Sequence, residues 1–344
     1  MLATAPPLLQ IDNLSVHFPL RAGLLRRQVG EVRAVDHVSL TLKQEETIGL
    51  VGESGCGKST LGRAVVGLAR PTGGTVHILG TDRNTLRGDA LKQMRRQVQI
   101  VFQDPIGSLN PRFRIRRVLL EGRRIQHIGD GRSESEVVDD ILQRVGLAPD
   151  IADRFPHELS GGQRQRVGIA RTLVLGPRLI VADEPVSALD VSVQSQVLNL
   201  FADLRREFGL SYLFIAHNLA VVAYIADTVA VMYLGKIVEH GRSDQVIGRP
   251  LHPYTVALLS AVPDVSGGYR DHRLKLQGEI PSAIAPPSGC RFRTRCPIAR
   301  EICAREEPPL VAHLPAHSVA CHFAGEFETT MSCATPRAAE RTLS

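Results

Sequence analysis

The sequence has no run of about 18 or more uncharged apolar residues, which is the length that a helix needs to cross a bilayer. Its most apolar stretch, from Leu219 to Leu234, is interrupted by Asp227. The first twelve residues, MLATAPPLLQID, lack both a basic start and a continuous apolar core, so they do not resemble a secretory signal. The chain is therefore not expected to cross a membrane by itself, and the cytoplasm is the expected compartment.

Aromatic residues are also scarce and make up 4% of the 344 residues. The formal net charge is +6, and part of the positive charge lies in the segment 18–35, at Arg21, Arg26, Arg27 and Arg33. A basic run of this kind is usually a solvated loop. Basic charge without aromatic-rich binding stretches gives little support for nucleic-acid binding, and no nucleic-acid partner is expected.

Apolar runs typical of strands alternate with helical patterns along the chain. TIGLVGES precedes KSTLGRAVVGLA, PRLIVADEP precedes QSQVLNLFADLRREF, and LSYLFIAH precedes NLAVVAYIAD. This alternation predicts an α/β fold with a mostly parallel sheet covered by helices. The stretch from about 102 to 160 is mainly helical in pattern, so we expect a helical subdomain inserted in the α/β core.

The composition changes after residue 249, where Pro, Gly and Cys become frequent. We therefore predict a first domain over residues 1–249 and a separate, small C-terminal domain over residues 250–327. Residues 328–344 show no periodicity, which predicts a flexible tail.

A glycine-rich segment, GESGCGKST, follows the strand pattern TIGLV and precedes a helix. Its glycines allow successive backbone N–H groups to surround phosphate oxygens, and the positive end of the helix faces the same place. Lys58 is expected to neutralise the β and γ phosphates of ATP, and Ser59 to ligate Mg²⁺. The residues assigned to this phosphate loop are Gly52, Ser54, Gly55, Gly57, Lys58, Ser59 and Thr60. Taken alone, the loop fits a kinase or a GTPase equally well.

A second element, LIVADEP, is an apolar strand that ends in Asp183 and Glu184. Ligands of open α/β sheets bind at this carboxyl end of the strands. Asp183 suits the coordination shell of Mg²⁺, and Glu184 suits the general base or water-orienting group for attack on the γ-phosphate. The alternative is a pair of surface acids that caps the next helix.

The segment LSGGQ, residues 159–163, lies between these two elements. In isolation it could be a helix N-cap, because Ser160 can accept backbone N–H bonds. The order phosphate loop, Gln103 in VFQDP, LSGGQ, LIVADEP, SALD and His217 resembles the ATP-binding-cassette (ABC) family over residues 8–241. The resemblance implies an ABC-type P-loop NTPase core that binds and hydrolyses ATP with Mg²⁺.

The family resemblance also implies that two cassettes face each other head to tail, with ATP between the phosphate loop of one and the LSGGQ of the other. Ser160, Gly161, Gly162 and Gln163 would then act on the nucleotide of the facing subunit. A helix N-terminus with exposed N–H groups is suited to binding a γ-phosphate.

Four further roles follow from the resemblance. Gln103 would contact Mg²⁺ and the attacking water, Asp190 in SALD would cross the dimer interface, and His217 would contact the γ-phosphate as a catalytic residue with Glu184. Phe18 occupies the position where the family stacks an aromatic ring on adenine.

The sequence departs from the family pattern at two positions. Val186 stands where Thr is common, and Asn218 stands where Asp is usual beside His217. The second change removes a charge, so we expect it to alter the orientation of the imidazole.

Residues after 249 resemble the C-terminal extension of ATPase subunits that energise oligopeptide, dipeptide and nickel importers. SLNPR and DEPVSALDVS point to the F-type subunit. This resemblance implies a peripheral location on the cytoplasmic face of the inner membrane and three kinds of partner: a second ATPase subunit, two transmembrane permease subunits and an extracytoplasmic solute-binding protein. The second ATPase would be a D-type paralogue or a second copy of this chain. Recognition of the solute lies outside the chain.

Four cysteines fall in this extension, with gaps of five, six and seventeen residues between Cys290, Cys296, Cys303 and Cys321. Structural zinc sites usually have closer pairs. Four thiolates can hold a [4Fe–4S] cluster, and neighbouring arginines would offset its negative charge. Zinc and unliganded buried thiols remain the alternatives.

The rival function is a soluble ABC ATPase of DNA repair or translation. Such proteins usually carry a long coiled-coil insertion or two cassettes in one chain. The sequence has no such insertion and no internal repeat, which favours the transporter subunit.

Overall fold

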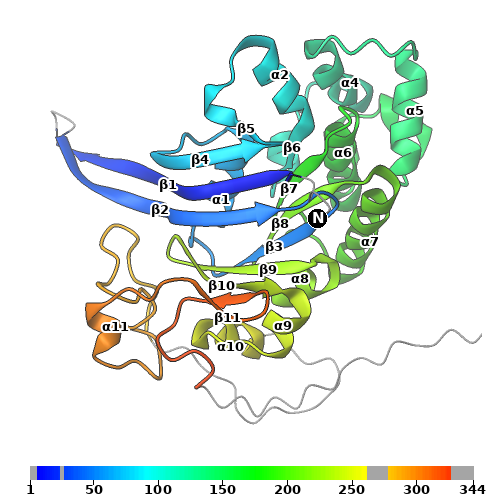
Figure 1. Cartoon of the computed structure of the whole chain (residues 1–344). Coiled ribbons are helices and arrows are strands. Elements are labelled where there is room, and N and C mark those ends of the chain that lie inside the picture. The colour runs from blue at the N-terminus through cyan, green and yellow to red at the C-terminus, as the bar shows by residue number, and fades with distance from the viewer. Residues whose placement is uncertain (1–5, 24–26, 262–277, 327–344) are drawn as a thin grey trace, which may run out of the picture.

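The computed structural model describes residues 6–23, 27–261 and 278–326. An eight-stranded sheet with the order β11-β12-β10-β9-β3-β8-β7-β6 runs through it (Figure 1). Its five parallel strands are β9 (Thr228–Tyr233), β3 (Thr47–Val51), β8 (Ser211–Ala216), β7 (Leu179–Asp183) and β6 (Val98–Val101). The predicted α/β class is thus confirmed.

The central parallel strands are buried on both faces. Every residue of β3, β7 and β8 is buried, as expected for parallel strands that read as continuous apolar runs. Helix α7 (Val191–Phe208) packs Phe201 edge-on against Tyr212 and Phe214, with ring centroids 5.3 and 5.6 Å apart. A Cβ on Gly49 of β3 would lie 2.0 Å from a methyl carbon of Val222, so α8 (Leu219–Ile225) touches the strand backbone.

Parallel strands place their carboxyl ends at one edge of the sheet. The segments that follow β3, β6, β7 and β8 therefore gather at that edge. These segments begin with Gly52, Phe102, Glu184 and His217, which brings together four motifs that are far apart in the sequence.

A second, antiparallel sheet has the order β2-β1-β4-β5, which the sequence did not predict. Its strands are β1 (Leu9–Ala22), β2 (Arg27–Leu42), β4 (Gly73–Ile78) and β5 (Thr81–Asp82). Leu9 and Ile11 of β1 share a buried apolar core with Leu61 and Val65 of α1 (Lys58–Val66) and with Leu50 of β3. Helix α1 thus packs between the two sheets.

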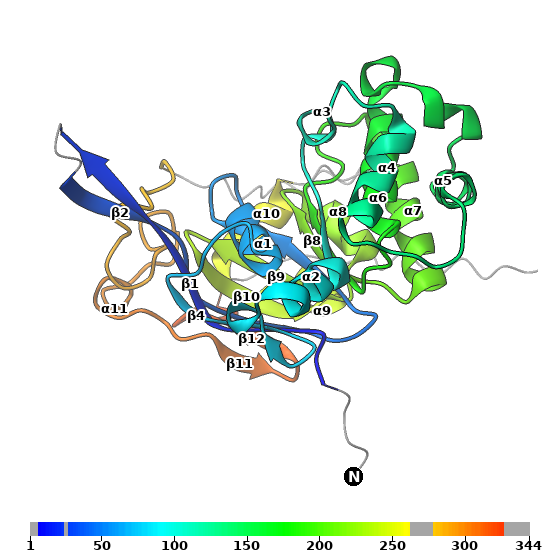
Figure 2. The same cartoon turned by 90° about the horizontal axis from the view of Figure 1, so that it is seen from above.

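The stretch predicted to be a helical subdomain contains α3 (Pro105–Ser108), α4 (Ile115–Ile125), α5 (Glu134–Arg144), and the 3₁₀ helices η2 (Pro149–Asp153) and η3 (Pro156–Glu158). Apolar residues of α4 and α5 are buried against the next helix, α6 (Gly161–Leu173). Both views place α4 and α5 at the opposite end of the molecule from α11 (Ile302–Arg305) (Figures 1 and 2).

The C-terminal extension continues the larger sheet instead of forming a sheet of its own. Strand β12 (His317–Val319) pairs with β10 (Lys236–Arg242), and β11 (Val311–Leu314) pairs with β12, all antiparallel. Helices α9 (Ser243–Gly248) and α10 (Pro253–Ser260) lie between these strands in the chain. The predicted tail, residues 328–344, lies outside the described residues, and the predicted domain boundaries stay predictions.

The remaining elements are the short helix η1 (Arg83–Thr85) and the helix α2 (Gly88–Gln97). Among the described residues, no helix combines the length and the apolar character that a membrane crossing requires.

Candidate functional site

The predicted phosphate loop connects β3 to α1 and packs closely against neighbouring backbone. Gly57 has φ +109°, and a Cβ there would lie 1.9 Å from the carbonyl oxygen of Ala34. A Cβ on Gly52 would lie 2.2 Å from the carbonyl oxygen of Met232. Both positions therefore require glycine, because a Cβ at either one would clash with a neighbouring backbone carbonyl. At Gly57 the positive φ is a second reason.

Lys58 is the buried cation of this loop, with 4% of the residue exposed. Its Nζ atom donates to the carbonyl oxygens of Gly52 at 2.8 Å and Glu53 at 3.0 Å. A buried ammonium group needs such partners, because leaving it unpaired would be costly. These bonds hold the charge inside the loop, where it can attract a phosphate group.

Ser59 and Asp183 bring the loop and the end of β7 together. The Ser59 hydroxyl donates to Oδ1 of Asp183 at 2.7 Å. Burial raises the pKa of Asp183 above the ordinary value, while the hydrogen bond from Ser59 opposes that shift. A hydroxyl and a carboxylate oxygen side by side are the hard ligands that Mg²⁺ takes in nucleotide sites, so the pair fits that ion.

Glu184 adopts a backbone conformation that is unusual for a residue other than glycine, with φ +46°. Its N–H donates to the carbonyl oxygen of Ile215 at 3.0 Å, and its own carbonyl accepts from the Ser187 N–H at 3.2 Å and hydroxyl at 3.0 Å. Strained residues persist where their surroundings fix them in this way, and they are frequent at functional sites. The sequence motifs did not identify Ser187, although its place two residues after LIVADEP, at the start of SALD, was a usable signal.

The side chain of Glu184 meets the two other predicted catalytic residues. The Nε2 atom of Gln103 donates to Oε2 of Glu184 at 2.9 Å, and Nδ1 of His217 lies 3.7 Å from the same oxygen. The three residues belong to segments that follow β6, β7 and β8. The arrangement can hold a water between a carboxylate, an amide and an imidazole, which suits attack on a phosphate.

A cavity of about 540 Å³ opens beside these side chains. It is lined by Ser54, Gln103, Asp104, Glu184, Ser187, Ala188 and His217. The phosphate loop and the predicted catalytic residues thus face one space.

The two departures from the family pattern have local explanations. The Oδ1 atom of Asn218 accepts the Ala220 N–H at 2.8 Å and caps α8. The Asn218 side chain therefore caps the helix, and the His217 ring lies against Glu184. Val186 is 4% exposed and lies in the apolar core, where a threonine hydroxyl would need a partner.

The LSGGQ segment forms the start of α6. The Ser160 hydroxyl accepts the Gln163 N–H at 3.3 Å, and the Gln163 side chain accepts the Ser160 N–H at 2.9 Å, which is a capping box. The helix geometry leaves the N–H groups of Gly161 and Gly162 without partners inside the helix. This segment does not line the cavity described above, so the chain does not bring LSGGQ to its own phosphate loop there.

Asp190 lies beside LSGGQ, and Phe18 lies on the antiparallel sheet. The exposed Asp190 directly precedes α7, and its neighbour Leu189 lies close to the start of α6, where a Cβ on Gly161 would be 3.7 Å from a Leu189 methyl carbon. Phe18 pairs with Val32 across β1 and β2 and is 45% exposed, so its ring is available for stacking.

The four cysteines of the extension are free thiols. Burial raises the pKa of Cys290, Cys296 and Cys321 to about 11, and neighbouring cysteines add to each shift. The Cys290 N–H donates to the carbonyl oxygen of Cys303 at 2.8 Å, so these two lie side by side. Across residues 6–23, 27–261 and 278–326, however, no three His, Cys, Asp or Glu side chains are grouped to hold a metal ion.

Comparison with known proteins identifies the family. Residues 35–187 match the ABC transporter family, and residues 238–303 match the oligopeptide/dipeptide transporter C-terminal region. The oligopeptide transport ATP-binding protein AppF of Bacillus subtilis is 50% identical over 324 residues, or 93% of this chain and 98% of AppF. This chain belongs to the ABC transporter ATPases.

Other relatives of this ABC ATPase agree. The putative oligopeptide transport ATP-binding protein YkfD of B. subtilis is 49% identical, covering 94% of this chain and 97% of YkfD. A putative peptide import ATP-binding protein of Brucella ovis is also 49% identical, over 92% of this chain and 98% of its own length. The resemblance predicted from the motifs is therefore confirmed.

Solved structures support the fold of the ABC ATPase. A dimeric ATP-binding cassette, MJ0796, in a post-hydrolysis state with ADP and Pi has a TM-score of 0.61 and 27% identity, covering 68% of this chain and 98% of that one. CbiO1 from Clostridium perfringens has a TM-score of 0.60 and 25% identity, with coverages of 71% and 92%.

Proposed function

We propose that this ABC ATPase drives the import of peptides or a related solute. The observation that carries the proposal is the match to oligopeptide transport ATP-binding proteins along nearly the whole of both chains. The match includes the C-terminal extension, which a generic cassette does not need. The solute itself is selected by other subunits.

The site residues have defined roles in ATP hydrolysis. Lys58 attracts the β and γ phosphates, and Ser59 with Asp183 holds Mg²⁺, which neutralises charge on the phosphate oxygens when bound. Glu184 accepts a proton from the attacking water or orients it. Gln103 would contact Mg²⁺ and the attacking water, and His217 would contact the γ-phosphate. Both side chains also lie against the Glu184 carboxylate. Phe18 stacks on the adenine ring.

The ATP site is completed by a second cassette. Because α6 begins away from the cavity of its own chain, the N–H groups of Gly161 and Gly162 are placed to bind the γ-phosphate held by a facing subunit. Asp190 lies next to this helix end and contacts the facing subunit. We assign that place to a D-type paralogue, with two permease subunits and a solute-binding protein completing a complex at the inner face of the membrane.

A second proposal concerns the four cysteines and a [4Fe–4S] cluster. Its support is the chemistry of four free thiols within one extension. The described residues contain no group of three His, Cys, Asp or Glu side chains that could hold a metal ion, so the structure adds no further support. Iron and acid-labile sulfide in anaerobically purified protein would support the cluster, zinc would favour the zinc alternative, and absence of all three would exclude both.

The transport proposal is tested by purifying the tagged chain from gently solubilised membranes. We expect two permeases, a second ATPase and a solute-binding protein to copurify, with ATPase activity stimulated by the loaded binding protein. Recovery only in the soluble fraction with DNA-repair or ribosomal proteins would contradict the proposal and favour the soluble ABC ATPase.

A further inference from the structure

The phosphate loop contains a carboxylate, Glu53, between Gly52 and Ser54. A negative charge next to the place where phosphates bind would repel ATP unless it is neutralised. Lys58 contacts the carbonyl oxygen of Glu53 and not its carboxylate, so another group is required. The loop alone does not supply that group.

The group comes from the C-terminal extension. Arg295 donates from Nη1 to Oε2 of Glu53 at 2.6 Å and from Nη2 to Oε1 at 3.0 Å, across 242 positions of sequence. The Arg295 side chain is 7% exposed and the Glu53 side chain 26%. A bidentate arginine contact of this kind fixes the carboxylate in one orientation and is stronger than a single hydrogen bond.

The backbone of Glu53 is held by a second residue beyond position 250. The Glu53 N–H donates to the hydroxyl oxygen of Tyr254 at 2.7 Å. Tyr254 is fully buried on α10, and its ring packs on Tyr233 and Phe292 with centroid distances of 4.8 and 5.4 Å. This packing holds the hydroxyl in place, so Tyr254 fixes the start of the loop.

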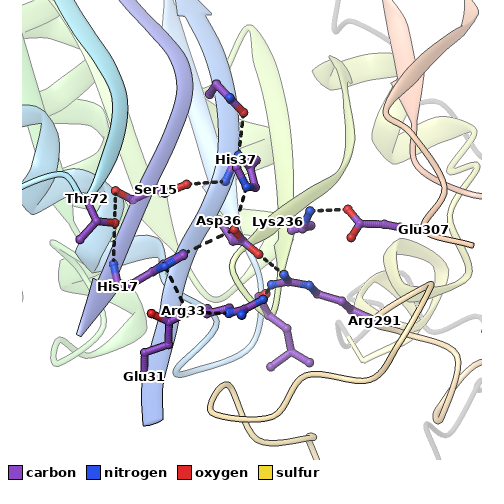
Figure 3. A network of polar contacts seen from close by, with 12 residues as sticks. Ser15, His17, Glu31, Arg33, Asp36, His37, Thr72, Lys236, Arg291 and Glu307 are labelled. Atoms are coloured by element: carbon purple, nitrogen blue, oxygen red, sulfur yellow. Dashed lines mark hydrogen bonds and ion pairs between the residues drawn. The ribbon is translucent and has the colours of Figure 1, made fainter. Parts of the chain in front are cut away.

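The other half of the loop is held through Cys56. Its carbonyl oxygen accepts the Gly235 N–H at 2.9 Å, and the Gly235 carbonyl accepts the Asp36 N–H at 2.9 Å. Arg291 forms a buried ion pair with Asp36 and donates to the carbonyl oxygen of Leu234. Figure 3 shows Arg291 and His17 of β1 approaching Asp36 from opposite sides.

We propose that Arg295 and Tyr254 are positioning residues for ATP: they fix Glu53, and Arg295 also cancels its charge, so that the phosphate loop can accept a nucleotide. The inference rests on the proposed binding of ATP by the loop. It makes the C-terminal extension part of the nucleotide site, although neither residue lies among the residues 35–187 that match the ABC transporter family.

Two effects of Arg295 are separable. As a structural contact, it would only stabilise the extension against the core. As a neutralising charge, it lowers the repulsion between Glu53 and the phosphates, and this effect disappears when Glu53 carries no charge. The pair Arg295→Ala and Glu53→Gln therefore distinguishes the two.

The test measures the Kd of a fluorescent ATP analogue with Mg²⁺ on the purified full-length chain, and KM and kcat for ATP in the assembled transporter. We expect Arg295→Ala to raise Kd and KM about tenfold or more with little change in kcat, as for a loss of uniform binding. Adding Glu53→Gln should return Kd to within about threefold of the parent. Tyr254→Phe should raise Kd several-fold while keeping the packed ring.

Two controls match these changes. Arg293→Ala removes the same charge two residues away, where the guanidinium donates to the carbonyl and hydroxyl oxygens of Ser288. Tyr212→Phe removes a buried hydroxyl that donates to the carbonyl oxygen of Phe201 at 3.1 Å. Both should bind the analogue like the parent chain.

The outcomes separate this inference from the function on which it rests. Lys58→Ala should lose nucleotide binding, and unchanged binding there would refute the proposed ATP site itself. With binding lost in Lys58→Ala, parent-like Kd in both Arg295→Ala and Tyr254→Phe would overturn the inference. Failure of Glu53→Gln to restore binding would overturn the neutralising role. Tyr254→Phe still provides the test where Arg295→Ala does not fold.

Discussion

The backbone N–H of His252 donates to the carboxylate of Glu239 at 3.0 Å, in a region where both residues are almost fully buried. The ring of His252 caps α10 by accepting the Tyr254 N–H at 3.1 Å. A second histidine, His317, contacts the same carboxylate from β12 at 2.8 Å. Glu239 thus joins two segments of the extension, the start of α10 and β12, to the core sheet.

The burial of His252 predicts that the folded protein loses stability at acid pH. Burial lowers the pKa of His252 from 6.5 to about 4, although Glu239 opposes the shift. Below pH 6.5 the unfolded chain binds a proton that the folded chain excludes, so stability present at neutral pH is lost as pH falls toward 4, by about 3 kcal/mol. Burial also lowers the pKa of His240, which acts in the same direction.

Urea unfolding at several pH values measures this loss. His252→Asn keeps an acceptor for the helix cap but does not titrate, so we expect a shallower pH dependence between pH 7 and 4 whatever its absolute stability. An identical pH dependence in the parent and the variant would refute the role of His252.

Glu184→Gln should reduce ATP turnover by about a hundredfold or more, because the proton acceptor is lost while the phosphate contacts remain. Nucleotide affinity should stay near that of the parent, as measured with the fluorescent analogue. Glu207→Gln, which removes an exposed carboxylate at the end of α7, serves as the control and should keep full activity. Near parental turnover of Glu184→Gln in the assembled transporter would exclude Glu184 as the catalytic group.

If LSGGQ acts on the nucleotide of the facing subunit, as we propose, Ser160→Arg should leave ATP binding by the isolated chain unchanged and abolish hydrolysis in the assembled transporter. The matched control is Ser133→Arg, since Ser133 caps α5 with the same capping box. Each change should cost about 1 kcal/mol of stability through the lost cap. Weakened binding of ATP by the isolated Ser160 variant would contradict action in trans.

Arg291 and Asp36 should show strong energetic coupling. Removing either partner, in Arg291→Met or Asp36→Asn, is expected to cost about 3–5 kcal/mol, because the other group is left buried and unpaired. The double variant should recover part of that loss in urea unfolding. Arg305→Met, at an exposed pair with Glu301, should cost less than about 1 kcal/mol. Additive losses in the double variant would refute the coupling.

The nucleotide site could be predicted to a large extent because its motifs are local. Each one follows a buried strand, so the α/β pattern alone places Ser59 near Asp183 and Gln103 near Glu184 at one edge of the sheet. Ser160 caps α6, as the alternative interpretation of LSGGQ predicted, and it is also exposed. A short motif with its own helix or strand carries enough information to define its geometry.

The remaining features depend on contacts between distant segments. Nothing near Glu53 indicates that Arg295 neutralises it, and the pairing of β12 with β10 is set by packing and not by a local pattern. The positive φ of Glu184 is held by hydrogen bonds of its backbone to β8 and Ser187.

The dependence of the phosphate loop on Tyr254 and Arg295 has a consequence for biosynthesis. The ribosome synthesises the phosphate loop early, but Tyr254 and Arg295, which contact Glu53, are added more than 200 residues later. A nascent or prematurely terminated chain can therefore contain every residue of the region matched to the ABC transporter family and still lack the two residues that we propose position the phosphate loop. If Tyr254 and Arg295 position the loop as we propose, such a fragment should bind ATP more weakly than a chain that includes both residues.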